Sequence, residues 1–576
     1  MGFFKNTDMP AKQPKKGGRK ATAFVFVMVA LETVTFSSNA ASLFNYFHGY
    51  MNFSLTKSAN SVTNFMGTAF LVSLFGGFIS DTYLSRFKTC LIFGCIQTMG
   101  YVLLAVQAHS KQLRPLPCRG VPPSQMSRCE HASTNQEAML FTSLYLVVLG
   151  NGAIKAALPS LGADQFDERD PKEGGWLSSY FNWYYFFINI GAIIGLTCVV
   201  WINTNTGWDW AFGLCSVAIA IGLVVLSIGR SGFRHNVPKG SPLTRIIQVL
   251  VAAIRNRNIP LPDRTEELHE VHDKDEQSEI LQRTDQFRFL DHAAIVTDSQ
   301  DTTTSTTNGS WNTCTVTQVE ETKILVRMIP IILSTVFLNT CLAQLQTFTM
   351  QQSSTLDRKI GTFEIPAPSI GVISLLFLFV LIPLYDRVFV PFARKITKNP
   401  TGITQLQRIG VGLIFSAISM AVSGIIEKHR KNVAREHGLV DSPGPLPMSV
   451  FWLAIQDSIF AFAHVFALVG LLEFFYAESS AGMKSLGAAI SWCSFAFGYF
   501  GSTVVVEVVN KVSGGWLANN NLNRDRLEYF YWLLAGLSVV NFGVYLLSAS
   551  WYKYKKVQVK LVGNSRNDCV EEMELM

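Results

Sequence analysis

Apolar residues in this chain gather in long blocks, and polar residues fill the segments between them. Each block holds roughly twenty residues, enough for an α-helix to cross a hydrocarbon core about 30 Å thick. The predicted spans are residues 22–46, 58–79, 88–108, 136–157, 178–202, 209–229, 325–346, 366–386, 403–425, 449–476, 485–508 and 527–550. The pattern therefore predicts an all-α membrane protein with twelve transmembrane helices.

A polar stretch in the middle of the chain separates the spans into two sets of six. We therefore divide the chain into a cytoplasmic tail, a six-helix bundle, a cytoplasmic linker, a second six-helix bundle and a second tail. These parts are residues 1–21, 22–229, 230–324, 325–550 and 551–576. Two six-helix bundles around a central cavity form the architecture of a rocking-bundle transporter.

The linker combines two kinds of sequence. Its first part places apolar residues at helical spacing beside Arg245, Arg255 and Arg257, which predicts an amphipathic helix on the inner membrane surface. The run DSQDTTTSTTNGS at 298–310 has too few apolar side chains to form a packed core. We therefore predict a disordered segment there.

The low fraction of charged residues is typical of a protein surrounded by lipid. Only 15% of the 576 residues are charged, whereas 49% are hydrophobic. The net charge is +7, but Lys and Arg lie at the ends of spans, so nucleic acid is not a predicted partner. Basic clusters lie before the first span and after the second, eighth and last spans. The positive-inside rule then predicts that both termini are cytoplasmic, although basic residues in the 109–135 loop oppose this orientation.

Neither the spacing of the cysteines nor any catalytic motif in the sequence indicates a metal site or an enzyme. The ten cysteines include no CxxC pair and no spacing typical of metal ligands, so neither a metal site nor a cofactor is predicted. Cys118 and Cys129 flank a proline-rich loop on the predicted outer side, and a disulfide between them is an open alternative. The chain lacks a nucleophile elbow and a phosphate-binding glycine loop. We therefore predict that it is not an enzyme.

Residues 76–88, GGFISDTYLSRFK, follow the second span and resemble the cytoplasmic loop motif of the major facilitator superfamily. Glycines in this motif allow two helices to approach closely. Asp81 can cap a helix and can pair with cations in contacts that break when the bundles rock. We therefore predict that Asp81, Arg86 and Lys88 form an intracellular gating latch.

Further motifs point to a family. Three of them, GNGAIK at 150–155, GADQFD at 162–167 and YFFINIG at 185–191, look like motifs of the proton-dependent oligopeptide transporter family. The second half agrees through VEE at 319–321, YDR at 385–387, LQRIG at 406–410, LEFFY at 472–476 and LNR at 522–524. Across nearly the whole chain, the pattern most resembles the plant nitrate and peptide transporter family, nearest the branch with abscisic acid, gibberellin and nitrate importers. The resemblance implies the major facilitator fold and a place in the plasma membrane.

Four ionisable side chains lie inside predicted spans: Glu32, Lys155, His464 and Glu473. Each costs at least about 2.5 kcal/mol there and so needs a reason. In the resembled family, the positions of Lys155 and Glu473 line the central cavity and pair with each other in one state and with substrate or a proton in another. The alternative is a static buried pair that only fixes helix packing. His464 is either a hydrogen-bonded cavity histidine or, with an ordinary pKa of about 6.5, a proton acceptor or substrate contact.

The chain departs from the family pattern at three places. VALET at 29–33 replaces the ExxER motif, so one carboxylate, Glu32, remains and the cation is absent. Leu342 stands where the family's nitrate carrier has a histidine, which argues against nitrate because leucine cannot donate to an anion. ESSAGM at 478–483 replaces EAPxxM and removes a proline before the eleventh span. The first of these departures leaves proton coupling open, because the motif's second carboxylate and its cation are absent.

Together these patterns predict an alternating-access transporter that imports a small solute, either nitrate or a carboxylate plant hormone such as abscisic acid or gibberellin. Lys155 would attract the anion, and Glu473 would release Lys155 on protonation or substrate binding. A non-transporting solute sensor or scaffold and an uncoupled facilitator are the alternatives. The predicted partners are a small-molecule or anion substrate, the lipid bilayer and, if coupling survives, protons, and the oligomeric state stays open.

Overall fold

The fold is known from a computed structural model that describes most of the chain. The described residues are 17–53, 55–116, 132–167, 171–234, 242–262, 268–270, 280–295, 311–361, 363–364, 370–398, 402–441, 444–480, 483–517, 521–555 and 557–558. Within them, twelve helical segments are long and apolar enough to cross a membrane. The predicted all-α membrane fold is therefore confirmed. Cys118, Cys129 and the run at 298–310 lie outside the described residues.

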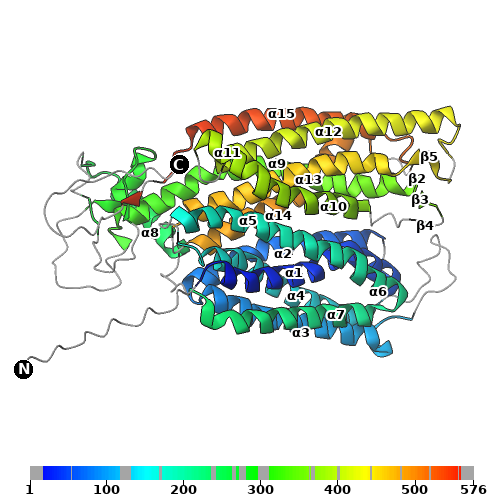
Figure 1. Ribbon diagram of the computed structural model, residues 1–576, viewed down its shortest axis with the longest axis horizontal. Coiled ribbons are helices and arrows are strands. Elements are labelled where there is room, and N and C mark those ends of the chain that lie inside the picture. Colours follow the sequence, from blue (N-terminus) through cyan, green and yellow to red (C-terminus); the bar gives the residue numbers. More distant parts are fainter. Residues whose placement is uncertain are drawn as a thin grey trace, which may run out of the picture.

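The first bundle holds six of these spans (Figure 1). Its long helices are α1 (Arg19–Asn45), α2 (Leu55–Thr82), α3 (Arg86–His109), α4 (Thr134–Ala163), α5 (Pro171–Ile194) and α7 (Trp208–Ile228). A π-helical turn at Tyr46–Tyr50 extends α1, and another at Gly195–Val199 joins α5 to α6 (Val200–Asn205). These wider turns let one span continue through a local change of helix geometry.

The second bundle holds the other six spans and lies beside the first (Figure 1). Its long helices are α9 (Val316–Ser354), α10 (Gly371–Leu384), α12 (Gln405–Glu436), α13 (Phe451–Glu478), α14 (Lys484–Ser513) and α15 (Leu527–Trp551). A π-helical turn at Tyr385–Phe389 joins α10 to α11 (Val390–Thr397). The bundles meet where α14 packs against α2 and α4, and where α5 packs against α10 and α13.

Helix α9 begins at Val316, well before the predicted start of its span at residue 325. Thr315 and Gln318 form a capping box at this start. Lys323 in the next turn is buried and contacts two carboxylates, Glu320 Oε1 at 2.8 Å and Asp291 Oδ1 at 2.6 Å. Hydropathy could not extend the span over these charged turns, because their burial depends on contacts with the linker.

Two glycines of the GGFISD motif allow helices to approach closely, as the motif predicted. A Cβ atom added to Gly76 of α2 would lie 2.3 Å from Ala153 Cα of α4. A Cβ atom added to Gly77 would lie 2.9 Å from the Ser485 carbonyl oxygen of α14. Gly76 therefore allows packing within the first bundle, and Gly77 allows packing between the bundles.

The described part of the linker lies at one end of the bundles, which we call the linker side (Figure 1). Its helix α8 (Pro242–Arg255) buries one face against the 3₁₀ segment Arg288–Ala294. The opposite apolar face is exposed and consists of Ile247, Leu250, Val251 and Ile254. The amphipathic helix is thus present, and its contact with the inner membrane surface stays a prediction.

Short strands complete the fold. On the linker side, β1 (Ile280–Leu281) pairs antiparallel with β6 (Val557–Gln558) and so joins the linker to the second tail. At the opposite end, which we call the far side, β2 (Leu356–Asp357) pairs parallel with β5 (Leu446–Ser449) (Figure 1). Also there, β3 (Lys359–Ile360) and β4 (Phe363–Glu364) form an antiparallel pair. The basic clusters predict that the linker side is cytoplasmic.

Candidate functional site

Lys155 of α4 is buried at the interface between the bundles, with an exposed fraction of 8%. Its Nζ lies 3.4 Å from Glu32 Oε1 of α1, and the Asn151 side chain also donates to that oxygen. The ammonium group lies 4.1 Å from the ring centroid of Phe36 and 5.3 Å from that of Trp492. Trp492 belongs to α14 in the second bundle, and its Nε1 donates to the Lys155 carbonyl oxygen at 3.1 Å. Lys155 therefore places an ion pair of the first bundle against an aromatic side chain of the second.

Glu473 of α13 pairs with a cation that was not among the predicted site residues. Arg408 Nη1 lies 3.5 Å from Glu473 Oε2, and Arg408 Nη2 donates to Asn182 Oδ1 of α5 at 2.6 Å. The guanidinium also lies over the Tyr385 ring at 4.6 Å. The predicted direct pair of Lys155 with Glu473 is not formed in this conformation. Each of these buried charges already has its own partner of opposite sign, which offsets the cost of burial.

His464 of α13 bridges the bundles through a hydrogen bond. Its Nδ1 lies 2.7 Å from the Tyr185 hydroxyl of α5, and its ring meets that of Phe495 edge to face at 5.5 Å. Its Nε2 is buried and has no hydrogen-bond partner among the described residues. The first of the two interpretations, a hydrogen-bonded histidine, fits Nδ1, and the second, a proton acceptor or substrate contact, stays a prediction.

Asp81 and Arg86 belong to a buried polar network that joins α2, α3 and α4 to α14. Arg86 Nη2 lies 3.3 Å from Asp81 Oδ1, and Arg86 also pairs with Asp164 at the end of α4. Arg86 Nε donates to Ser485 Oγ at 2.8 Å. Asp81 Oδ2 accepts from the Leu486 backbone N–H at 2.9 Å, so it caps the start of a helix in the other bundle. We call these five residues the α2–α14 latch.

Lys88 does not join this network. Its side chain is exposed, and its backbone N–H donates to Ser85 Oγ at the start of α3. The α2–α14 latch therefore contains Asp164 where the prediction had Lys88. Two nearby contacts extend it: Tyr476 of α13 donates to Asp164 Oδ1 at 3.0 Å, and Ser160 Oγ donates to the Lys484 carbonyl oxygen at 3.1 Å.

A second set of contacts joins the bundles on the linker side around one carboxylate. Asp386, in the π-helical turn after α10, accepts three hydrogen bonds from α5. Ser179 Oγ donates at 2.8 Å, Asn182 Nδ2 at 2.8 Å and Trp183 Nε1 at 3.0 Å. We call these four residues the α5–α10 latch. Together the two latches hold the linker-side ends of the bundles against each other.

Three charged residues that make these contacts were not among the predicted site residues, although each lies in a segment that carried the family resemblance. Asp164 lies in GADQFD, Asp386 in YDR and Arg408 in LQRIG. All three are charged residues at the ends of apolar spans, where a charge usually marks only the membrane boundary. Burial distinguishes these three residues from charges that only mark the membrane boundary. Their burial depends on contacts with the neighbouring bundle, which the sequence does not show.

Twelve membrane helices in two bundles, with buried ion pairs at the bundle interface, are the architecture of a membrane transporter. The model of the POT family matches residues 87–521, and the chain belongs to this family. Two Arabidopsis thaliana relatives are similar over nearly their whole length. Protein NRT1/PTR family 4.5 is 42% identical, over 94% of this chain and 95% of that protein. Protein NRT1/PTR family 4.6 is 40% identical, over 95% and 96%. A family of transporters also supports the prediction that the chain is not an enzyme.

Solved structures agree on the fold. The crystal structure of an auto-inhibited POT family peptide transporter has a TM-score of 0.57 at 18% identity and covers 96% of this chain and 99% of its own. The in meso structure of the POT family transporter PepTSo has a TM-score of 0.58 at 17% identity and covers 93% and 98%. At such identities these structures support the arrangement of helices.

Proposed function

We propose that this transporter imports a small anion across the plasma membrane by alternating access, either a carboxylate plant hormone such as abscisic acid or gibberellin, or nitrate. The observation that carries the proposal is the ion pair between buried Lys155 and Glu32 at the bundle interface. A buried ammonium group needs a counterion. A substrate anion can take that place when Glu32 moves away or accepts a proton.

The same ion pair supplies a route for proton coupling. Glu32 is the carboxylate that remains in VALET at 29–33, and Lys155 supplies from another helix the cation that this segment lacks. A proton on Glu32 neutralises the carboxylate and frees Lys155 for a substrate anion. Binding of the proton and binding of the anion then favour each other. Glu32 therefore takes the releasing role that the sequence assigned to Glu473.

Glu473 and the two latches support alternating access. Arg408 holds Glu473 and also donates to Asn182, so this pair reaches across the bundles next to the α5–α10 latch. With both latches formed, a solute at Lys155 is separated from the linker side. Release toward that side requires the latches to open, which is how two rocking bundles alternate access to one site.

The surroundings of Lys155 favour a carboxylate with an apolar body over nitrate. Phe36 and Trp492 place aromatic rings beside the ammonium group. Leu342 of α9 packs against the hydrophobic cores of both bundles and therefore lies between them. Ligand sites of this kind combine apolar walls with a few placed polar groups. Nitrate needs several donors, and Leu342 supplies none.

The test is uptake of labelled abscisic acid, gibberellin and nitrate into cells that express the chain, at an external pH of about 5.5 and about 7.5. We expect saturable uptake at acid pH, and Lys155→Ala is expected to lower uptake at least about tenfold because it removes the cation that binds the anion. Lys88→Ala makes the same chemical change at an exposed site and should leave uptake intact. Surface expression of the variants must be matched, and cells without the chain measure passive entry of the weak acids.

Other outcomes separate the alternatives. Saturable uptake that ignores external pH would indicate an uncoupled facilitator. Stoichiometric binding without uptake of any of the three solutes would indicate a sensor or scaffold. Uptake by Lys155→Ala equal to that of Lys88→Ala would contradict the role of Lys155 whatever the substrate.

A further inference from the structure

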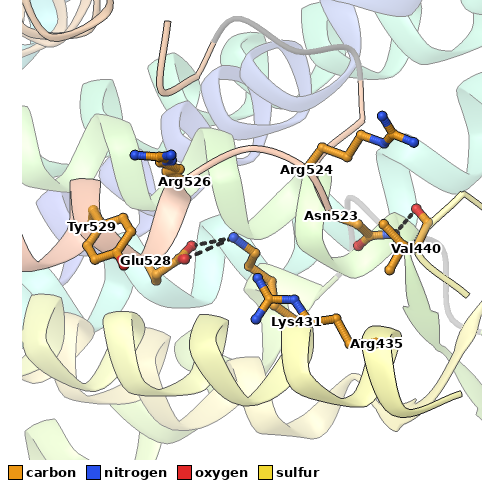
Figure 2. A pocket seen from close by; sticks show the side chains of 8 residues that line it. All are labelled: Lys431, Arg435, Val440, Asn523, Arg524, Arg526, Glu528 and Tyr529. Carbon is orange, nitrogen blue, oxygen red and sulfur yellow. Dashed lines mark hydrogen bonds and ion pairs between the residues drawn. The ribbon is translucent and has the colours of Figure 1, made fainter. Parts of the chain in front are cut away.

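A basic cavity lies on the far side of the second bundle, away from the bundle interface. It has a volume of about 500 Å³ and lies between the end of α12 and the start of α15 (Figure 2). Four basic side chains line it, Lys431, Arg435, Arg524 and Arg526, together with one carboxylate, Glu528. The positive-inside rule places basic clusters on the other face of a membrane protein, so this one needs a separate reason.

Two of the four cations are already neutralised. Lys431 Nζ lies 2.8 Å from Glu528 Oε2. Arg524 makes two contacts of 2.8 Å with the two oxygens of Asp441. The pKa of the Asp441 carboxyl is lowered by its hydrogen bond to Arg524, so this carboxylate stays ionised and remains a counterion for Arg524.

The other two cations, Arg435 and Arg526, have exposed side chains and no carboxylate partner among the described residues. Figure 2 shows them on opposite sides of the pair formed by Lys431 and Glu528. Positive charge therefore exceeds negative charge around the cavity. Guanidinium groups present planar pairs of N–H donors that suit phosphate and carboxylate oxygens.

The loop that carries Arg526 is held in place by buried contacts, so its backbone is fixed before any ligand arrives. Arg430 Nη1 donates to Asn523 Oδ1 at 2.6 Å, and Lys431 Nζ donates to the Asp525 carbonyl oxygen at 2.7 Å. Arg430 is itself fully buried against Glu427. A site held in this way loses less conformational freedom on binding.

We propose that this cavity binds a polyvalent anion of the phosphate class, with Arg435 and Arg526 as the binding groups. The volume exceeds that of one simple ion and falls in the range of small-molecule sites, about 300–1,000 Å³. The start of α15 at Leu527 directs backbone N–H groups toward the same region, which adds to the positive potential. The anion is either free in solution or carried by a lipid headgroup. The site is separate from Lys155 and does not depend on the proposed substrate.

The test uses the purified full-length chain in detergent, with pyrophosphate as the probe and Tm as the readout. Sodium pyrophosphate is titrated against sodium chloride at equal ionic strength, and a saturable rise in Tm is expected because a ligand of the folded state stabilises it. The double variant Arg435→Gln/Arg526→Gln should weaken the apparent affinity at least about tenfold. Arg257→Gln/Lys511→Gln removes the same charge from exposed positions elsewhere and should leave the affinity unchanged.

A second arm distinguishes the two sources of the anion. The chain is placed in nanodiscs of phosphatidylcholine with or without phosphatidic acid, and Tm is measured for the wild type and the double variant. A rise with phosphatidic acid that the double variant lacks assigns the site to a lipid headgroup, whereas a rise with pyrophosphate alone assigns it to a free anion. A rise of equal size in the wild type and the double variant, or no rise with either probe, would overturn the proposal.

Discussion

The two latches close the same end of the molecule by different chemistry. In the α2–α14 latch, the cation Arg86 lies between two carboxylates, and the three side chains are at most 9% exposed. In the α5–α10 latch, the single carboxylate of Asp386 accepts from three neutral donors and is only partly buried. One latch therefore depends on the balance of buried charges, and the other on hydrogen bonds to one charge.

This difference determines how each latch responds to damage. Removing one charge from a buried cluster leaves the remaining charges unpaired in a medium that solvates them poorly, so the loss is large. A partly buried carboxylate and its neutral donors can exchange their hydrogen bonds for water, so the loss is modest. The α2–α14 latch should therefore open as a unit, whereas the α5–α10 latch should adjust the balance between closed and open states.

The largest effect is expected for Arg86→Gln, which leaves Asp81 and Asp164 buried without their cation. The linker-side closed state should lose about 3–5 kcal/mol relative to the open state. Ser160 lies closed off at this interface, so a Ser160→Cys reporter can be labelled from the linker side with a membrane-impermeant maleimide. Labelling should become much faster with Arg86→Gln, and the same chain without the reporter gives the background.

A smaller effect is expected for Asp386→Asn. The neutral amide can accept from some of the three donors but offers its own N–H groups to the others, which costs about 2 kcal/mol. The Ser160→Cys reporter should be labelled faster than in the unaltered chain and more slowly than with Arg86→Gln. The reverse order would show that Asp386 carries more of the closure than the buried charges do.

A double variant measures whether the latches act independently. The two latches share no residue, so the effects of Arg86→Gln and Asp386→Asn on closure should add to within about 0.5 kcal/mol. Labelling of the double variant must stay slow enough to measure. The labelling rate constants of the unaltered chain, the two single variants and the double variant, each with the reporter, then give the coupling energy. A coupling energy well above that value would indicate that the contacts of one latch depend on those of the other.

The smallest effect is expected for Lys88→Gln, within about 0.5 kcal/mol, because its exposed side chain contacts neither carboxylate of the latch. Labelling of Ser160→Cys should match that of the unaltered chain. An effect as large as that of Arg86→Gln would restore the original prediction that Lys88 belongs to the latch.

The apolar pattern predicted the spans well because crossing a membrane is a property of each segment by itself. Its errors lie at charged helix ends, such as the first turns of α9, where Lys323 is buried by residues of the linker. The motif at 76–88 also predicted the tight helix contacts of Gly76 and Gly77. The structure gives Arg86 a buried polar contact and leaves Lys88 exposed, since positions two residues apart on a helix face different sides.

The sequence by itself determined the twelve spans, the division into two bundles and the ionisable residues within the membrane, because hydropathy along the chain carries these, and its motifs carried the resemblance to the family. Only the tertiary structure decided which charges pair: Lys155 with Glu32, and Glu473 with Arg408. It also decided that Asp386 joins the bundles and that α12 and α15 form a basic cavity. The physical reason is that pairing depends on the rotation and spacing of helices far apart in the chain, and no local pattern records these quantities.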